Sequence, residues 1–154
     1  MVYMNKRDGG FSLVELIVVV SIMAVLMAIL MPSYVRYLEQ SRIRHDDAVI
    51  TNIQKAANAL VVDDKFYESI AGDVTVYINN QGVAYQLNGV GAMSADFLDE
   101  INTSVYGTTT PSGGFTSRTF AGSSGLYIRL HYDPNLLAYV TEYYNFPDLS
   151  IYHQ

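Results

Sequence analysis

The sequence contains no cysteine and no tryptophan, and only 16% of its 154 residues are charged. The absence of cysteine excludes disulfide frameworks, thiolate metal sites and cysteine nucleophiles. Soluble domains carry roughly 25% charged residues, so part of this chain is expected not to be water-soluble. A net charge of -6 argues against a surface that binds nucleic acid through bulk positive charge, and we expect no nucleic-acid partner.

A long apolar stretch lies near the start of the chain. Leu16 to Met31 contain a single polar residue, Ser21. Extended back to Phe11, the stretch would be about 31 Å long as a helix, enough to span the hydrocarbon core of a bilayer. Lys6 and Arg7 precede it, so the positive-inside rule favours a cytoplasmic N-terminus, with the bulk of the chain on the outer side.

Glu15 stands at the beginning of this stretch. A carboxylate inside an apolar membrane segment costs about 2.5 to 3.5 kcal/mol on insertion scales. The sequence alone allows two interpretations: the side chain lies at the level of the lipid headgroups, or it has a partner that offsets this cost.

The residues on both sides of Glu15 form a specific pattern. A short basic leader ends in Gly9-Gly10, Phe11 follows, and Glu15 stands four positions later. The apolar stretch then leads to Pro32, Tyr34 and Tyr37. Position by position, this pattern resembles the leader and first helix of the type IV pilin family. The resemblance covers about residues 6–44, roughly a quarter of the chain.

The resemblance implies a domain organisation, a processing step and a location for the chain. Residues 1–10 would be a prepilin leader, residues 11–31 a transmembrane and fibre-core helix, and residues 32–154 a pilin globular domain. A prepilin peptidase would cut after Gly10 and the new N-terminal residue, Phe11, would be methylated. The precursor would lie in the membrane with a cytoplasmic N-terminus, and the mature subunit in an extracellular or periplasmic pilus filament.

The residues expected to act in assembly are Phe11, Glu15, Pro32, Tyr34 and Tyr37. The partners would be further copies of the chain in a helical homo-oligomer, and the pilus assembly machinery of the inner or cell membrane. After cleavage, the amine of Phe11 and the Glu15 carboxylate of a neighbouring subunit would carry opposite charges that meet in the assembly. Because proline weakens the helix just upstream, we expect a short melted segment next to Pro32 in the fibre.

The remainder of the sequence predicts an α+β fold, in which a long N-terminal helix with an apolar half and an amphipathic half packs on an antiparallel sheet of about four strands. The amphipathic half is residues 32–63, with apolar residues on one face and charges, Asp46 and Asp47 among them, on the other. The predicted packing positions are Val35, Leu38, Ile43, Ile50, Ile53, Ala57, Leu60 and Val61. The predicted strands are 74–78, 83–87, 126–132 and 136–144, with a turn at 79–82 and a possible short strand around 115–120.

Three further local predictions concern the globular part. Ser94 is expected to be the N-cap of a short helix. The loop 106–125 and the tail after Asn145 are expected to face outward on the fibre and contact surfaces or partners. The candidate contact residues in that loop are Tyr106, Thr108, Thr109, Thr110 and Phe115.

The sequence offers little catalytic chemistry. His45, His131 and His153 have no second ligand at metal spacing, and the His45-Asp46-Asp47 run is interpreted as solvated charges. We therefore expect no metal, no cofactor and no enzyme activity. The strand tyrosines are expected to be half-buried packing residues, as for Tyr77, Tyr85, Tyr127 and Tyr139.

Together these features predict a structural subunit of a type IV pilus-like surface filament that serves adhesion or motility. The alternatives are a pseudopilin of a type II secretion or DNA-uptake system, and a monomeric membrane-anchored binding domain. A pilin is favoured over a pseudopilin because major secretion-type subunits usually carry a calcium-binding acidic loop near the C-terminus. Here the only aspartates in that region are Asp133 and Asp148, fifteen residues apart.

Overall fold

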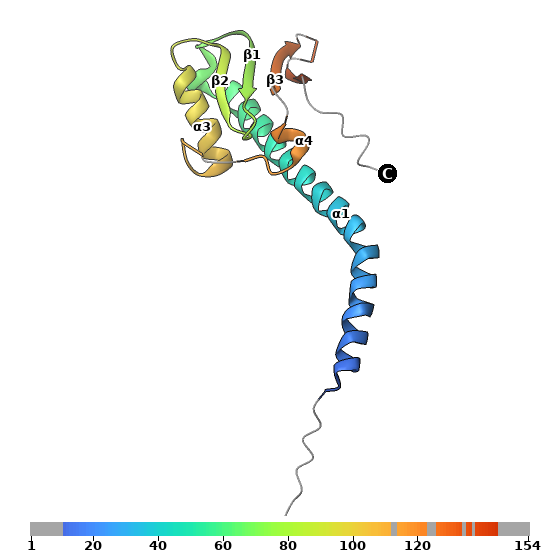
Figure 1. Cartoon of the computed structure of the whole chain (residues 1–154). Coiled ribbons are helices and arrows are strands. Elements are labelled where there is room, and N and C mark those ends of the chain that lie inside the picture. The colour runs from blue at the N-terminus through green and yellow to red at the C-terminus, as the bar shows by residue number, and fades with distance from the viewer. Residues whose placement is uncertain (1–10, 112–113, 123–125, 134, 137, 145–154) are drawn as a thin grey trace, which may run out of the picture. The chain divides into compact units, whose positions relative to one another are not determined.

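The structure is a computed structural model that describes residues 11–111, 114–122, 126–133, 135–136 and 138–144 (Figure 1). The predicted leader, with its cleavage residue Gly10, and the tail 145–154 lie outside the described residues. The chain divides into two compact units, residues 1–38 and 39–154, and each is described by itself.

A single long helix, α1, runs from Leu13 to Val61 and confirms the predicted N-terminal helix. It continues through Pro32 without interruption. The melted segment was predicted for the assembled fibre, so it stays a prediction. In the first unit every residue from 11 to 37 is exposed.

The second unit contains one antiparallel sheet of four strands, which confirms the predicted α+β class. The strands lie in the order β2-β1-β3-β4. The hairpin turn between β1 and β2 is fixed by Asn79, whose Oδ1 accepts hydrogen bonds from the N–H groups of Gln81 and Val83, both at 3.0 Å. Gly82 adopts a φ of 77° in this turn, a conformation that favours glycine. The strands are β1 (Ile70–Ile78), β2 (Ala84–Val90), β3 (Leu126–Asp133) and β4 (Ala138–Tyr144).

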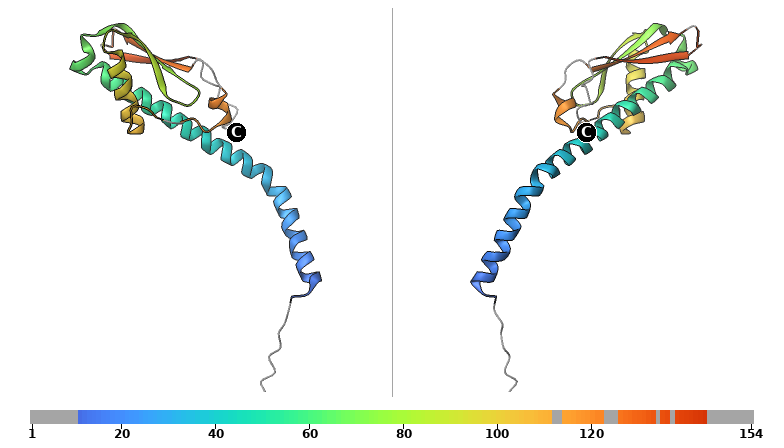
Figure 2. Two further views of the ribbon diagram at one scale, coloured as in Figure 1. Left: turned by 60° about the vertical axis from the view of Figure 1, so that its left-hand side comes forward. Right: turned by 90° about the vertical axis from the view of Figure 1, so that its right-hand side faces the viewer.

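The core lies between the sheet and α1. Because successive side chains in a strand point to opposite faces, one set from β1 and β3 is buried. Figure 2 shows the C-terminal half of α1 and the helix α3 on the same side of the sheet. The buried strand residues are Val74, Val76, Ile78, Leu126, Ile128 and Leu130. The α1 residues in the same core are Ile43, Val49, Ile50, Ile53, Ala57, Leu60 and Val61.

The predicted packing positions are confirmed from Ile43 onward, whereas Val35 is exposed and Leu38 is half-buried. Among the strand tyrosines, Tyr77, Tyr127 and Tyr139 are half-buried as predicted. The prediction for Tyr85 was wrong, because its side chain lies on the exposed side of β2.

Three short helices complete the second unit: α2 (Asp64–Tyr67), α3 (Ser94–Tyr106) and α4 (Arg118–Ala121). The prediction of Ser94 as an N-cap was wrong, since Ser94 is already helical and the cap position is Met93, which makes no side-chain cap bond. The short strand expected around 115–120 is also absent from the described residues. Ser117 ends extended structure there by capping α4, its Oγ accepting from the Phe120 N–H at 3.2 Å.

The prediction that Asp46 is a solvated charge was wrong, because Asp46 is a buried residue of α1. Its side chain is 0% exposed. Oδ1 accepts from the N–H of Thr116 at 2.8 Å and from its hydroxyl at 3.2 Å, and Oδ2 accepts from the Ser117 N–H at 2.8 Å. Two turns earlier on α1, Glu39 accepts from the Arg118 N–H at 2.8 Å. These carboxylates therefore fasten the start of α4 to α1.

We predict that Asp46→Ala lowers the free energy of unfolding by about 3 kcal/mol, because the buried Ser117 N–H and the Thr116 N–H lose the charged acceptor to which they bond in the unmodified chain. Asp46→Asn keeps one acceptor oxygen and should lose less. Urea unfolding of the detergent-solubilised chain, followed by the near-UV circular dichroism of its tyrosines, measures the change. The neighbouring Asp47 is exposed, so Asp47→Ala is the matched control and should change stability by less than about 0.5 kcal/mol. Equal stability of the Asp46→Ala and Asp47→Ala variants would contradict the prediction.

Candidate functional site

The candidate site is the exposed apolar half of α1 and the turn where the helix begins. By length and composition, α1 is capable of crossing a membrane, and no residue of its most apolar window is buried. Phe11, just before the helix, is 89% exposed. Apolar side chains displayed around a whole helix need either lipid or other protein around them.

Ser12 and Glu15 form a reciprocal capping box at the start of α1. The Ser12 N–H donates to Glu15 Oε2 at 2.9 Å, and Ser12 Oγ accepts from the Val14 N–H at 3.3 Å. The Leu16 N–H closes the first turn on the Ser12 carbonyl at 3.2 Å. Two amide groups that a helix start leaves unpaired are thus satisfied by side chains.

This box gives Glu15 a partner within its own subunit, in addition to the neighbour's Phe11 amine that the resemblance implies. A carboxylate in the first turn also lies at the positive end of the helix dipole, which stabilises its charge. Within one subunit, Glu15 is therefore neither unpaired nor dependent on a neighbour. The signal was readable in advance, because Ser12-Leu13-Val14-Glu15 has the serine-x-x-glutamate spacing of a capping box.

The other predicted assembly residues lie farther along α1. Pro32 is inside the helix. Tyr34 and Tyr37 are exposed and stand three positions apart, so their side chains share one side of the helix. The apolar surface of the helix thus extends past Pro32 as an aromatic surface.

The structure divides the five predicted surface-contact residues into two groups. Thr108, Thr109 and Thr110 are exposed. Tyr106 and Phe115 are partly buried and pack against the core. Tyr106 and Phe115 hold the loop to the β1–β2 turn.

The Tyr106 hydroxyl donates to the Gly82 carbonyl at 2.6 Å, and the Phe115 N–H donates to the Gln81 carbonyl at 3.0 Å. Burial, and then the negative charge of Asp46, raises the pKa of Tyr106 to about 12. Tyr106 therefore remains a neutral hydrogen-bond donor at any physiological pH, and its role here is to anchor the loop.

One cluster of ionisable groups lies on β1 and β3. Asp73 accepts from Arg129 Nε at 2.9 Å and pairs with His131 Nδ1 at 2.7 Å. The hydrogen bonds from His131 and then Arg129 hold the pKa of Asp73 below its ordinary value. All three side chains are partly exposed, and within the described residues no group of three histidine, aspartate or glutamate side chains is arranged to hold a metal ion.

The comparisons with known proteins bear on the N-terminal segment. A family model described as the prokaryotic N-terminal methylation motif matches residues 5–31. No match was found among curated proteins or solved structures. The chain thus carries the prepilin leader signature of type IV pilins, as the sequence pattern predicted. The motif supports a protein of the type IV pilin or pseudopilin type, processed by prepilin peptidase, and with the apolar helix it fits a membrane-inserted precursor.

The capping box predicts a specific pattern of amide exchange at the helix start. Ser12→Ala should speed hydrogen exchange of the Val14 amide, and Glu15→Ala that of the Ser12 amide, each by about fivefold for a cap of about 1 kcal/mol. NMR of the chain in micelles measures both rates. Ser21→Ala is the control, because the Ser21 hydroxyl donates to the Ile17 carbonyl within the helix at 2.7 Å. Unchanged rates in both variants would contradict the box.

Proposed function

We propose that this chain is a structural, non-catalytic subunit of a type IV pilus-like surface filament that serves adhesion or motility. The observation that carries the proposal is the fully exposed apolar half of α1, which coincides with the prepilin leader signature. In the bilayer, lipid covers this surface. In a filament outside the bilayer, the corresponding helices of other subunits cover it, because exposing it to water is unfavourable.

The monomeric anchor is the weaker candidate. An anchor needs an apolar helix and can use Glu15 as a helix cap, but it has no use for a peptidase site directly before Phe11. A filament subunit uses that site, because cleavage creates an amine on Phe11 that the charge on Glu15 attracts. In this proposal, the Glu15 carboxylate exchanges its bond to the Ser12 N–H for an ion pair with the Phe11 amine of a neighbour.

We predict that the mature chain begins at Phe11 with a methylated amine. Gly10→Leu should leave uncut precursor in the membrane, because a bulky side chain does not fit a peptidase site shaped for glycine. Gly10→Ala is the matched control and should still be cut to a measurable extent. Mass spectrometry of intact subunits from membranes and from sheared filaments separates the two forms. An intact leader on assembled subunits would overturn this prediction.

We further predict that Glu15→Ala blocks or slows assembly and does not impair membrane insertion. Removal of the acid makes insertion easier by up to about 3 kcal/mol, so lost filaments cannot be attributed to the membrane step. The measurement is the ratio of subunit in sheared filaments to subunit in membranes.

Glu15→Gln separates the two roles of the side chain. Glutamine still accepts the Ser12 N–H in a capping box but carries no charge. If the ion pair drives assembly, this variant fails as Glu15→Ala does. Normal filament yield from Glu15→Gln would show that only the helix cap matters, and normal yield from Glu15→Ala would contradict any assembly role for Glu15.

A further inference from the structure

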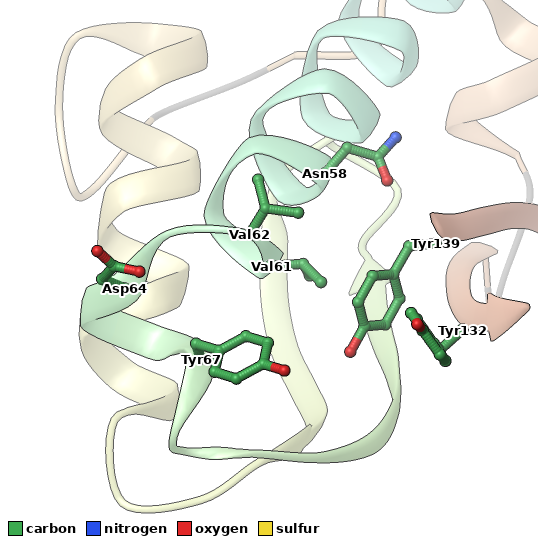
Figure 3. Close-up of a pocket in the computed structure, with 7 residues that line it drawn as sticks. All are labelled: Asn58, Val61, Val62, Asp64, Tyr67, Tyr132 and Tyr139. Atoms are coloured by element: carbon green, nitrogen blue, oxygen red, sulfur yellow. The ribbon is translucent and has the colours of Figure 1, made fainter. Parts of the chain in front are cut away.

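A cleft of about 560 Å³ opens at the end of α1 in the second unit (Figure 3). Its size is within the range of about 300 to 1,000 Å³ that is typical of small-molecule sites. Residues from four elements line it, and they combine aromatic, polar and apolar side chains. They include Asn58 and Val61 of α1, Asp64 and Tyr67 of α2, Tyr132 of β3 and Tyr139 of β4.

The three tyrosines give the cleft its character. Tyr67 is 67% exposed and Tyr132 is 41% exposed, whereas Tyr139 is half-buried. Tyr132 and Tyr139 contact each other edge to face, with ring centroids 5.4 Å apart. Figure 3 shows the hydroxyl groups of Tyr67 and Tyr139 directed toward each other across the cleft. Burial, and then the proximity of the other two tyrosines, raises the pKa of Tyr139, so its hydroxyl stays protonated and can donate.

These hydroxyl groups are available to a ligand. Among the residues that the structure describes, none of them has a hydrogen-bond partner, whereas the Tyr143 and Tyr144 hydroxyls bond to Gln54 and Glu142. Asn58 donates from Nδ2 to Thr141 Oγ1 at 3.4 Å, which orients its amide and leaves Oδ1 as an acceptor. The cleft thus offers hydrogen-bond donors and acceptors beside aromatic surface.

The charge of the lining selects the class of ligand. Asp64 is the one charged residue among the described lining residues, so the cleft disfavours an anion. An entirely apolar ligand would leave the tyrosine hydroxyls and Asp64 desolvated without partners. A quaternary ammonium ion needs aromatic faces around it, but Tyr132 and Tyr139 use an edge and a face on each other.

We infer that this cleft binds a neutral sugar in pyranose form. A pyranose presents C–H groups that pack on an aromatic ring and hydroxyl groups that bond to phenol, amide and carboxylate oxygens. Tyr67 supplies the accessible ring, and Asn58, Asp64 and the tyrosine hydroxyls supply the polar contacts. The site lies within residues 39–154, so the inference holds whether or not the chain assembles into filaments.

Saturation-transfer NMR on the full chain tests the inference. The probes are methyl glycosides of glucose, galactose, mannose, N-acetylglucosamine and N-acetylgalactosamine, with tetramethylammonium as the competing class. The detergent should have a polyoxyethylene headgroup, since sugar or choline headgroups would compete. We expect saturable binding of at least one glycoside, weakened about five- to tenfold by Tyr67→Ala. Tyr67→Phe, which removes only the hydroxyl, should weaken binding by about threefold.

The matched control is Tyr85→Ala, which removes another exposed tyrosine, 54% exposed on β2 and not part of the cleft lining. This variant should bind as the unmodified chain does. Because Tyr67 is largely exposed, Tyr67→Ala should fold normally, and its near-UV circular dichroism verifies that. The inference is overturned if no neutral glycoside gives a saturable signal that depends on Tyr67. It is also overturned if tetramethylammonium binds more tightly than every glycoside through the same residue.

Discussion

The structure depends on one unmet requirement: the apolar side chains of residues 11–31 have no cover within the described chain. Each large side chain of this kind gains roughly 1.5 to 3 kcal/mol when it leaves water, so the sum over the segment exceeds the net stability of an ordinary domain. No folded arrangement of the second unit offsets a cost of this size. This surface must therefore stay covered by lipid or by other protein, and in the proposed filament it passes from the first cover to the second without exposure to water.

The capping box holds the Glu15 carboxylate within a single subunit by an interaction of modest strength. A cap of about 1 kcal/mol is enough to occupy the carboxylate in a single subunit and small enough to be given up. A charge pair in a low-dielectric interface is a stronger attraction, provided that both groups keep good geometry. In the proposed filament, Ser12 would therefore keep the Glu15 carboxylate ordered before assembly without preventing the later ion pair. This also explains why Ser12 belongs to the site although the resemblance assigned it no role.

The elements that were predictable from sequence are those that local pattern determines. An apolar run followed by helical periodicity specified α1, and alternation of β-branched and aromatic residues specified all four strands. The predictions failed where a tertiary contact overrides local preference. Asp46 reads as a surface charge on α1, yet the N–H groups of Thr116 and Ser117, about seventy positions later, make it a core residue. The same contacts favour the short helix α4 over a strand. The cleft was also unpredictable, since Tyr67, Tyr132 and Tyr139 come together only when β3 and β4 pack beside the end of α1.

The arrangement of α1 separates two sets of constraints along one helix. Residues 11–37 are exposed, so their apolar character must suit the lipid or protein that surrounds them. From Ile43 onward the same helix is part of a closed core, in which Ile53 and Ala57 are fully buried against the sheet. That core is complete without the first unit. Residues on the outer sheet face, in the loop 107–111 and in the cleft can therefore be substituted without affecting how the apolar segment is covered. A chain built in this way can alter what it contacts without altering how its helix is covered.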